Sequence, residues 1–306
     1  MSRKKRGNPV HGWLVLDKPS GMTSTAAVGA IKRLYNAQKA GHAGTLDPLA
    51  TGILPIALGE ATKTVPYIVD GAKSYRFTVR WGIETDTDDS EGQVTASGGR
   101  VPSADEIVEV LPRFMGEILQ RPPRYSAVKI DGERAYDLAR EGATVEIAER
   151  PVVIDRLEIV GTTGDETVLE ADCGKGTYVR ALARDLGRTL GTYGHVTKLR
   201  RLEVGPFDEQ DAVTLAEVTE AAGRPDAARE LRTLLKPLES ALTDLIGLSV
   251  SREDALRLRR GNNVLLRGRD APIFEGLAYA TSMGDPVALV SAEHGYLVPK
   301  RVFMLG

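Results

Sequence analysis

The apolar residues near the start of the chain fall into runs that predict a strand, a helix and a second strand. Residues 12–16 form a short, almost wholly apolar run, which is typical of a buried strand. Thr23 or Ser24 can cap the helix that follows. Its apolar positions recur at helical spacing: Ala27, Val28, Ile31 and Leu34. Residues 41–48 have no period and predict a loop, and residues 53–58 predict the next buried strand.

The middle of the chain shows both strand and helix patterns. Residues 74–81 alternate between apolar and polar side chains, as in a strand with one buried face. Ser103 and Glu106 have the spacing of a capping box, which predicts the start of a helix. Three later segments complete this region: a strand at 168–173 and helices at 178–190 and 231–245.

The C-terminal part of the chain has a different pattern and predicts a second domain. A capped helix at 251–260 is stopped by Gly261. After it come only short strand-like runs, at 264–267, 277–282, 287–291 and 296–303. We therefore expect a domain boundary near Gly247. Because strands and helices do not alternate regularly, a doubly wound parallel sheet is disfavoured. We expect an α+β fold with a mixed, largely antiparallel sheet flanked by helices.

Charge is distributed unevenly along this 306-residue chain, whose net charge is −2. Residues 1–80 contain 12 Lys and Arg against 4 Asp and Glu. Residues 175–201 contain seven Lys and Arg, and their one acidic residue is Asp185. Basic surface confined to parts of an otherwise acidic protein would suit local contact with phosphate groups. Ordinary solvated helix faces are the alternative explanation.

Composition excludes several classes of protein. No run of about 18 apolar residues is present, so we expect no membrane span. The basic N-terminus is not followed by an apolar stretch, which argues against a signal peptide. The single cysteine, Cys173, excludes an internal disulfide and a cysteine-based zinc site, and the four histidines lack metal-ligand spacing. We expect a cytoplasmic protein without a metal.

Asp47 is the first candidate for chemistry. It lies in the glycine-bounded loop 41–48, directly before Pro48, which restricts Asp47 to extended backbone geometry. Functional loops often hold a reactive group between rigid elements in this way. The same Asp-Pro pair is also a common turn initiator, so the loop alone leaves both interpretations open.

Three other side chains could act with Asp47. Arg180, in the first turn of the helix 178–190, could pair with the carboxylate, favour its ionised form and fix its rotamer. The ring of Tyr75 could stack on a nucleic-acid base, which is worth roughly 1–3 kcal/mol. His42 could fill the gap left by an extruded nucleotide. A surface arginine, a core tyrosine and a loop histidine are the plain alternatives.

Motifs for other chemistry are absent from the sequence. There is no phosphate-binding loop of the Gly-x-x-x-x-Gly-Lys-Ser/Thr type, no Gly-x-Ser-x-Gly elbow and no His-Glu-x-x-His zinc motif. The zinc deaminase signature is also missing. The residues alone therefore indicate an α+β protein with an acid-containing loop, basic stretches and a β-rich C-terminal part.

Five blocks taken together resemble the TruB family of pseudouridine synthases. They occur in the family's order: GWLVLDKPSGMTS at 12–24, GHAGTLDPLATG at 41–52, YSAVK at 125–129, CGKGTYVR at 173–180 and HVTKLRR at 195–201. The resemblance covers most of residues 11–205. It implies an RNA-modifying isomerase of the pseudouridine synthase fold.

The resemblance also implies roles for individual residues. Asp47 matches the catalytic aspartate, and Arg180 matches the arginine paired with it. Tyr75 matches the tyrosine that stacks on the target base and handles its C5 proton. The remaining matches are Tyr178 and Leu199 at the pocket wall, Lys18 as a supporting basic residue and His42 in place of the flipped nucleotide.

Domains and partners follow from the same resemblance. Residues 8–247 would be the catalytic domain, with an RNA-gripping insertion at about 121–142, and residues 248–306 would be a small PUA-like RNA-binding domain. The implied substrate is the uridine at position 55 in the T-loop of tRNA, bound at the T-arm and elbow. The implied enzyme needs neither metal nor organic cofactor, has no obligate protein partner and is a monomer. A non-catalytic RNA-binding or RNA-folding protein, or a synthase acting on another RNA, remains an alternative.

Overall fold

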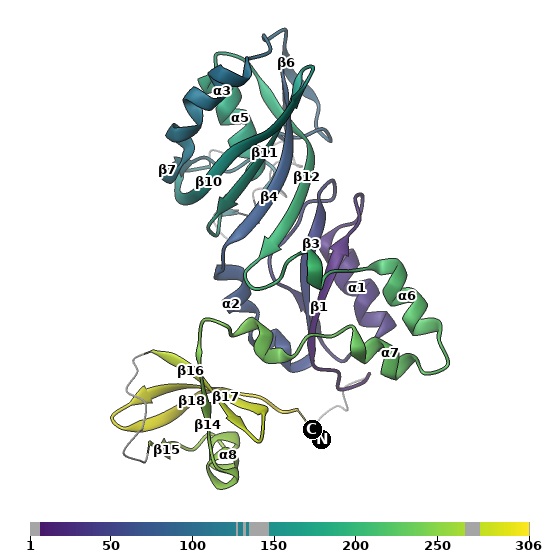
Figure 1. The fold of residues 1–306 in the computed structure, drawn as a ribbon, viewed down its shortest axis with the longest axis vertical. Coiled ribbons are helices and arrows are strands. Elements are labelled where there is room, and N and C mark those ends of the chain that lie inside the picture. Colours follow the sequence, from purple (N-terminus) through teal and green to yellow (C-terminus); the bar gives the residue numbers. More distant parts are fainter. Residues whose placement is uncertain (1–6, 127, 131–132, 135–146, 267–275, 306) are drawn as a thin grey trace.

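The computed structural model describes residues 7–126, 128–130, 133–134, 147–266 and 276–305, and a nine-stranded sheet is its largest element (Figure 1). In chain order its strands are β1 (Gly12–Lys18), β2 (Ala40–His42), β3 (Thr51–Leu58), β4 (Lys73–Trp81), β7 (Gly116–Gln120), β10 (Arg150–Thr163), β11 (Glu166–Cys173), β12 (Gly194–Val204) and β13 (Val213–Thr214). Across the sheet the order is β13, β1, β3, β12, β4, β11, β10 and β7, with β2 paired to β3.

The strand pairings make the sheet mixed but mostly antiparallel. β1 pairs in parallel with β13, and β3 pairs in parallel with β12. The remaining pairs in the described part of this sheet are antiparallel. The α+β fold expected from the sequence is confirmed. Two further strand pairs among the described residues are β5 (Ile83–Thr85) with β6 (Val94–Ser97), and β8 (Lys129–Ile130) with β9 (Glu133–Arg134).

Helices cover the sheet at both ends of its long axis (Figure 1). The α-helices are α1 (Ser24–Leu34), α2 (Val65–Asp70), α3 (Ala104–Val110), α5 (Val179–Thr189), α6 (Leu215–Gly223), α7 (Ala227–Thr233) and α8 (Arg252–Arg259). The 3-10 turns are η1 (Gly59–Lys63), η2 (Leu111–Phe114), η3 (Glu209–Asp211) and η4 (Leu238–Ala241). α3 and α5 lie beside β10 and β4, whereas α1, α6 and α7 lie near β1.

The helix starts agree with the sequence signals. The side chain of Thr23 accepts a hydrogen bond from the backbone N–H of Ala26, which caps α1. Both bonds of the capping box between Ser103 and Glu106 are present at the start of α3. The helix expected at 178–190 is α5, and it buries Leu182 and other apolar residues against the sheet.

Two apolar clusters pack the large sheet against the helices and against the C-terminal part of the chain. The larger one joins Ile31 of α1 and Leu186 of α5 to Phe77 of β4, all almost fully buried. The smaller one lies around Trp13 and includes Phe303 from the end of the chain. Burial of this apolar surface is the main stabilising contribution to the fold. Because the second cluster contains C-terminal residues, the C-terminal part packs on the large sheet.

The C-terminal part forms its own five-stranded sheet beside α8 (Figure 1). Its strands are β14 (Ile246–Ser249), β15 (Val264–Leu265), β16 (Leu277–Ser282), β17 (Asp285–Glu293) and β18 (Tyr296–Val302), in the order β14, β16, β17, β18 and β15. The capped helix and the short strands expected from the sequence are present. The exact boundary between the two domains stays a prediction.

Two expectations about local structure were wrong. The tract 231–245 is not one helix: α7 ends at Thr233, and Lys236 instead forms backbone hydrogen bonds with Trp13 in both directions. Pro237 explains the break, because it disfavours helical geometry in the residue before it and lacks an N–H donor. Residues 41–48 are not entirely loop either, because Ala40–His42 pair with β3. Half of the arm expected at 121–142 falls outside the described residues.

Candidate active site

The loop that carries Asp47 connects β2 to β3 and is held by residues from β1 and α1. The Oγ atom of Ser24 donates to the carbonyl of Leu46 and accepts from its N–H, both at 2.9 Å. The carbonyl of Pro48 accepts from the N–H of Gly21 at 2.8 Å and from Nζ of Lys18 at 3.3 Å. Asp47 therefore lies between two anchored neighbours, which restricts where its carboxylate can point.

Arg201 of β12 supports the same loop from below. Its side chain is almost fully buried, with 1% of the residue exposed. Nε donates to the carbonyl of Ile53 at 2.7 Å, Nη1 to that of Thr45 at 3.3 Å and Nη2 to that of Gly44 at 3.2 Å. Sequence reasoning placed Arg201 in a family block but gave it no role. A buried arginine that binds two carbonyls of the loop and one of β3 ties the loop to the sheet and is a positioning group for it.

Asp47 and Arg180 form the ion pair expected from the sequence. Nε of Arg180 lies 2.9 Å from Oδ2 of Asp47. The arginine side chain is 6% exposed and the aspartate side chain 34%, so a ligand can reach the carboxylate. The N–H does not meet hydrogen-bond geometry with any acceptor among the described residues. The contact is therefore electrostatic, and the distance rather than the angle defines it.

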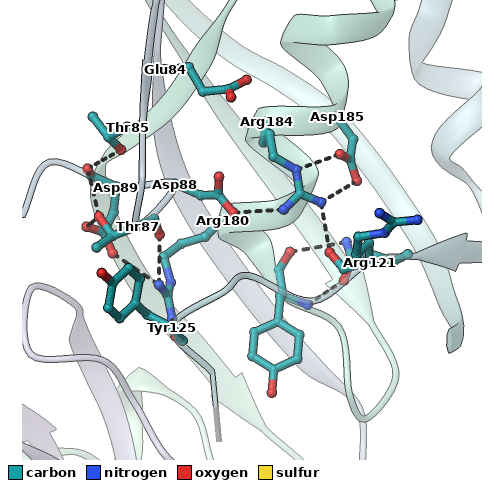
Figure 2. A network of polar contacts seen from close by, with 12 residues as sticks. Glu84, Thr85, Thr87, Asp88, Asp89, Arg121, Tyr125, Arg180, Arg184 and Asp185 are labelled. Carbon is teal, nitrogen blue, oxygen red and sulfur yellow. Dashed lines mark hydrogen bonds and ion pairs between the residues drawn. The ribbon is translucent and has the colours of Figure 1, made fainter. Parts of the chain in front are cut away.

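The rest of the Arg180 guanidinium is fixed by two segments that approach α5 (Figure 2). Nη1 donates to the carbonyl of Thr87 at 2.9 Å and lies 3.4 Å from Oδ2 of Asp89. Nη2 donates to the carbonyl of Tyr125 at 3.0 Å. Sequence reasoning described the segment 84–91 only as an acidic loop. The signal that the sequence offered for this segment was its pair of adjacent aspartates, Asp88 and Asp89.

Three titratable side chains close to Asp47 have shifted pKa values. Burial lowers the pKa of Lys18 to about 8, against the opposing effect of the Asp47 carboxylate. Burial and the positive charge of Arg201 lower the pKa of His42, so its ring is neutral at pH 7. Burial raises the pKa of Tyr75, whose hydroxyl therefore stays protonated. The site thus offers a protonated phenol and a neutral imidazole beside an ion pair.

Tyr178 and Leu199 lie on the elements that flank this ion pair. Tyr178 precedes α5, and the amide of Gln120 holds it by accepting from its N–H at 2.8 Å and donating to its carbonyl at 3.2 Å. Leu199 of β12 pairs with Phe77, and Arg201 pairs with Tyr75. Residues two apart on a strand share a face, so Leu199 and Tyr75 lie on the same side of the sheet. Sequence reasoning missed Gln120, which is 2% exposed.

Neither a metal cluster nor a membrane helix occurs in the described parts of the chain. No group of three or more His, Cys, Asp or Glu side chains there has the arrangement of a metal site. No helix there is long and apolar enough to cross a bilayer.

Solved structures with the same fold define the class of protein. The chain superposes on a chain in the crystal structure of a Cbf5-Nop10-Gar1 complex with a TM-score of 0.75 and 28% identity, over 96% of this chain and 85% of that one. It superposes on a chain of an H/ACA RNP bound to a substrate RNA containing 2′-deoxyuridine with a TM-score of 0.73 and 25% identity, over 99% and 92%. The fold is that of the pseudouridine synthases.

Sequence comparisons then identify the family. The model of the TruB family pseudouridylate synthase N-terminal domain matches residues 32–179, and that of the tRNA pseudouridylate synthase B C-terminal domain matches residues 180–243. The tRNA pseudouridine synthase B of Bradyrhizobium diazoefficiens is 57% identical over 99% of this chain and 91% of that protein. That of Brucella anthropi is 54% identical over 99% and 98%. The chain belongs to the TruB family of pseudouridine synthases and is an enzyme.

Proposed function

We propose that this enzyme converts uridine to pseudouridine at position 55 in the T-loop of tRNA, with Asp47 as the catalytic carboxylate. The observation that carries this proposal is the contact between Asp47 and the buried guanidinium of Arg180. A positive charge at 2.9 Å attracts the carboxylate and limits its movement. The names of the relatives, each a tRNA pseudouridine synthase B, support tRNA as the substrate.

The reaction requires only a rearrangement of bonds within one nucleotide. The glycosidic bond between C1′ and N1 breaks, the uracil turns, and C5 forms a new bond to C1′. The C5 proton leaves, and N1 gains a proton. The Asp47 carboxylate acts either as a nucleophile at C1′ or as a base at C2′. A deuterium isotope effect on the hydrogen at C2′ distinguishes the two routes.

The neighbouring side chains can each take one step. The uridine must leave its stack, which costs a few kcal/mol. Stacking on the ring of Tyr75 would offset part of this cost. The protonated Tyr75 hydroxyl would act as a relay, its oxygen accepting the C5 proton as its own proton passes to water. The neutral His42 ring would fill the space that the flipped nucleotide leaves. Tyr178 and Leu199 would form the pocket wall, with Lys18 holding the loop at Pro48.

The C-terminal sheet is proposed to bind the same tRNA as a PUA-like domain, near the acceptor end. Exposed arginines on and directly after α8, Arg257, Arg259 and Arg260, support contact with phosphates. The sheet is attached to the catalytic part, because the carbonyl of Val302 accepts from Lys63 at 2.7 Å and Glu60 accepts from the N–H of Met304 at 2.8 Å.

The substitution Asp47→Asn tests the proposed role directly. It keeps the size of the side chain but removes the charge, so we expect no pseudouridine in an unmodified tRNA transcript and tRNA binding close to wild type. Asp70→Asn is a matched control, because Asp70 is an exposed carboxylate paired with Lys175 at 2.9 Å. Product formation and binding are measured in parallel for both variants. Substantial turnover by Asp47→Asn would refute the role of this carboxylate.

A further inference from the structure

Two arginines of α5, four residues apart, face the same side of the helix and are nearly equally buried. The side chain of Arg180 is 6% exposed and that of Arg184 is 9% exposed. Residues at this spacing lie one helical turn apart on one face. Of these two arginines, only Arg180 forms an ion pair with Asp47. The burial of a second arginine beside it therefore needs its own explanation.

The two guanidiniums make parallel sets of contacts (Figure 2). Nη2 of Arg184 donates to the carbonyl of Arg121 at 2.8 Å, and Nη2 of Arg180 donates to the carbonyl of Tyr125 at 3.0 Å. Both arginines thus hold the segment 121–126 by its backbone. They also face a carboxylate through Nε: Asp185 at 2.8 Å for Arg184, and Asp47 at 2.9 Å for Arg180.

Both arginines also hold the turn 84–91, which we call the acidic turn. Nη1 of Arg184 pairs with Oδ2 of Asp88 at 2.9 Å, and Nη1 of Arg180 donates to the carbonyl of Thr87 at 2.9 Å. Each arginine therefore links the acidic turn to the segment 121–126. The groups held by Arg184 lie directly beside those that fix Arg180.

Asp88 has a backbone conformation that ties this turn to the sheet. Its φ of 59° lies in the left-handed region, which an aspartate adopts at some cost. Its carbonyl accepts from the N–H of Val196 on β12 at 3.1 Å. With its carboxylate on Arg184 and its backbone on β12, Asp88 sets the position of the next residue, Asp89, which faces Arg180 at 3.4 Å.

We infer that Asp88 and Arg184 form a positioning pair for the proposed reaction, which holds the acidic turn and the segment 121–126 so that Arg180 keeps Asp47 in place. This inference rests on the proposed function of Asp47. Both side chains of the pair are more than nine-tenths buried, so we assign neither a direct contact with the substrate. Their effect passes through the two segments that fix the Arg180 guanidinium, and a loosened guanidinium would lower the rate of the chemical step more than the affinity for tRNA.

The surroundings of Asp88 also make the pair sensitive to pH. Burial raises the pKa of Asp88 to about 6, although Arg184 and Arg180 oppose this shift and Glu84 and Asp185 add to it. On β12, the neighbouring titratable group is His195, whose Nδ1 lies 3.0 Å from the carbonyl of Ile83.

A raised carboxyl pKa means that the folded protein holds this proton more tightly than the unfolded chain does. Ionisation of Asp88 therefore opposes folding, and its contribution to stability falls as the pH rises from about 4 to about 6. At pH 7 this cost is fully present.

The test uses Asp88→Asn and Arg184→Lys, with Arg224→Lys as the control. Arg224 directly follows α6, outside the acidic turn and the segment 121–126, and it pairs with Glu220 at 2.7 Å with a side chain that is 52% exposed. For Asp88→Asn and Arg184→Lys we expect kcat on a tRNA transcript to fall about tenfold, with tRNA Kd changed less than about twofold. The double variant should lose no more kcat than the worse single variant, because both changes break the same contact between Asp88 and Arg184. Arg224→Lys should keep wild-type kcat.

Two further readouts separate positioning from a merely structural role. The melting temperature of Asp88→Asn at pH 7 should be unchanged or higher, since the buried charge is gone and Arg184 keeps Asp185. Wild-type kcat should fall as the pH is lowered through about 6, and Asp88→Asn should lack this step. Losses of kcat that only follow losses of melting temperature, or wild-type kcat in both variants, would overturn the inference. If Asp47→Asn remains active, the proposed function itself fails, whatever the result at Asp88.

Discussion

Tyr75 has two parts that the proposed reaction would use differently, the ring and the hydroxyl. The residue is half-buried on β4, and it pairs with Arg201 across the sheet. Burial raises the pKa of its hydroxyl, so the hydroxyl is protonated at neutral pH. A substitution that keeps the ring and removes the oxygen separates stacking from proton transfer.

Tyr75→Phe should bind tRNA normally and turn over slowly. The ring still stacks, but the proton at C5 loses its partner, so kcat should fall roughly hundredfold, as is typical for removal of a general acid or base. Single-turnover kinetics and a binding titration on the same tRNA check this. A variant with near wild-type kcat would show that the hydroxyl is dispensable, and a large loss of binding would show that the ring is displaced.

Arg201→Lys should loosen the catalytic loop. Lysine cannot reach the carbonyls of Gly44, Thr45 and Ile53 with the fork of donors that arginine provides. Leaving buried carbonyls unpaired costs about 1–3 kcal/mol of unfolding free energy, and kcat should fall with it. Urea unfolding measures the first effect.

Arg200→Lys is the control for Arg201→Lys. Arg200 is the adjacent residue, is one-third exposed and pairs with Asp17 at 3.0 Å. Its substitution should cost less than about 1 kcal/mol. Equal losses of unfolding free energy in both variants would mean that the hydrogen bonds from Arg201 to the carbonyls of Gly44, Thr45 and Ile53 add no stability of their own.

At the scale of elements, helices and strands with an unbroken apolar periodicity were predicted correctly from the sequence. The helix α1 and the strand β4 bury the expected residues, because in each the apolar spacing is intact. β10 was not predicted. Its pairing with β11 shifts register between Ile154 and Arg156 and again between Ile159 and Gly161, and each irregularity moves apolar residues to the other face.

The elements of the site were harder to predict than the residues in them. β12 lies inside the sheet between β3 and β4 but carries Lys198, Arg200 and Arg201, so its sequence does not read as a buried strand. The charges of Arg200 and Arg201 are explained by contacts to Asp17 and to the Asp47 loop, which depend on segments distant in sequence, whereas Lys198 is exposed. The contact of Asp47 with Arg180 was predicted from the family blocks, whereas the acidic turn that fixes Arg180 has no periodic signal of its own.

Gly52 is where β3 meets β12, and Gly52→Ala should separate these strands. Gly52 has φ +97°, and a Cβ there would lie 2.2 Å from the carbonyl oxygen of Arg201. That oxygen belongs to the backbone, so β12 would have to shift, at a cost of more than about 2 kcal/mol in unfolding free energy.

Gly21→Ala provides the matched control for this junction. Gly21 has φ +78°, but nothing lies within 4 Å of a Cβ there, so the variant should show only the backbone cost of about 1 kcal/mol. Urea unfolding of both variants compares them. Equal costs would mean that the contact with β12 is tolerated and that only the backbone conformation matters.

At the scale of the whole molecule, net charge and local charge lead to opposite expectations for tRNA binding. A net charge of −2 should repel a polyanion, and added salt would then strengthen binding or leave it unchanged. In the described part of the chain, however, strands from both basic segments are neighbours, because β3 and β4 both pair with β12. Exposed cations on these strands, such as Arg76 and Lys198, would bind phosphates and release counterions.

Binding should therefore weaken steeply with salt. If about four phosphates are contacted, the logarithm of the association constant should fall with the logarithm of salt concentration with a slope of about −3. The titration is best done with Asp47→Asn, so that the bound tRNA is not converted during the measurement. Between 50 and 200 mM salt such a slope amounts to a loss of roughly sixtyfold. A flat response would mean that shape and stacking, rather than the two basic segments, hold the tRNA on this sheet.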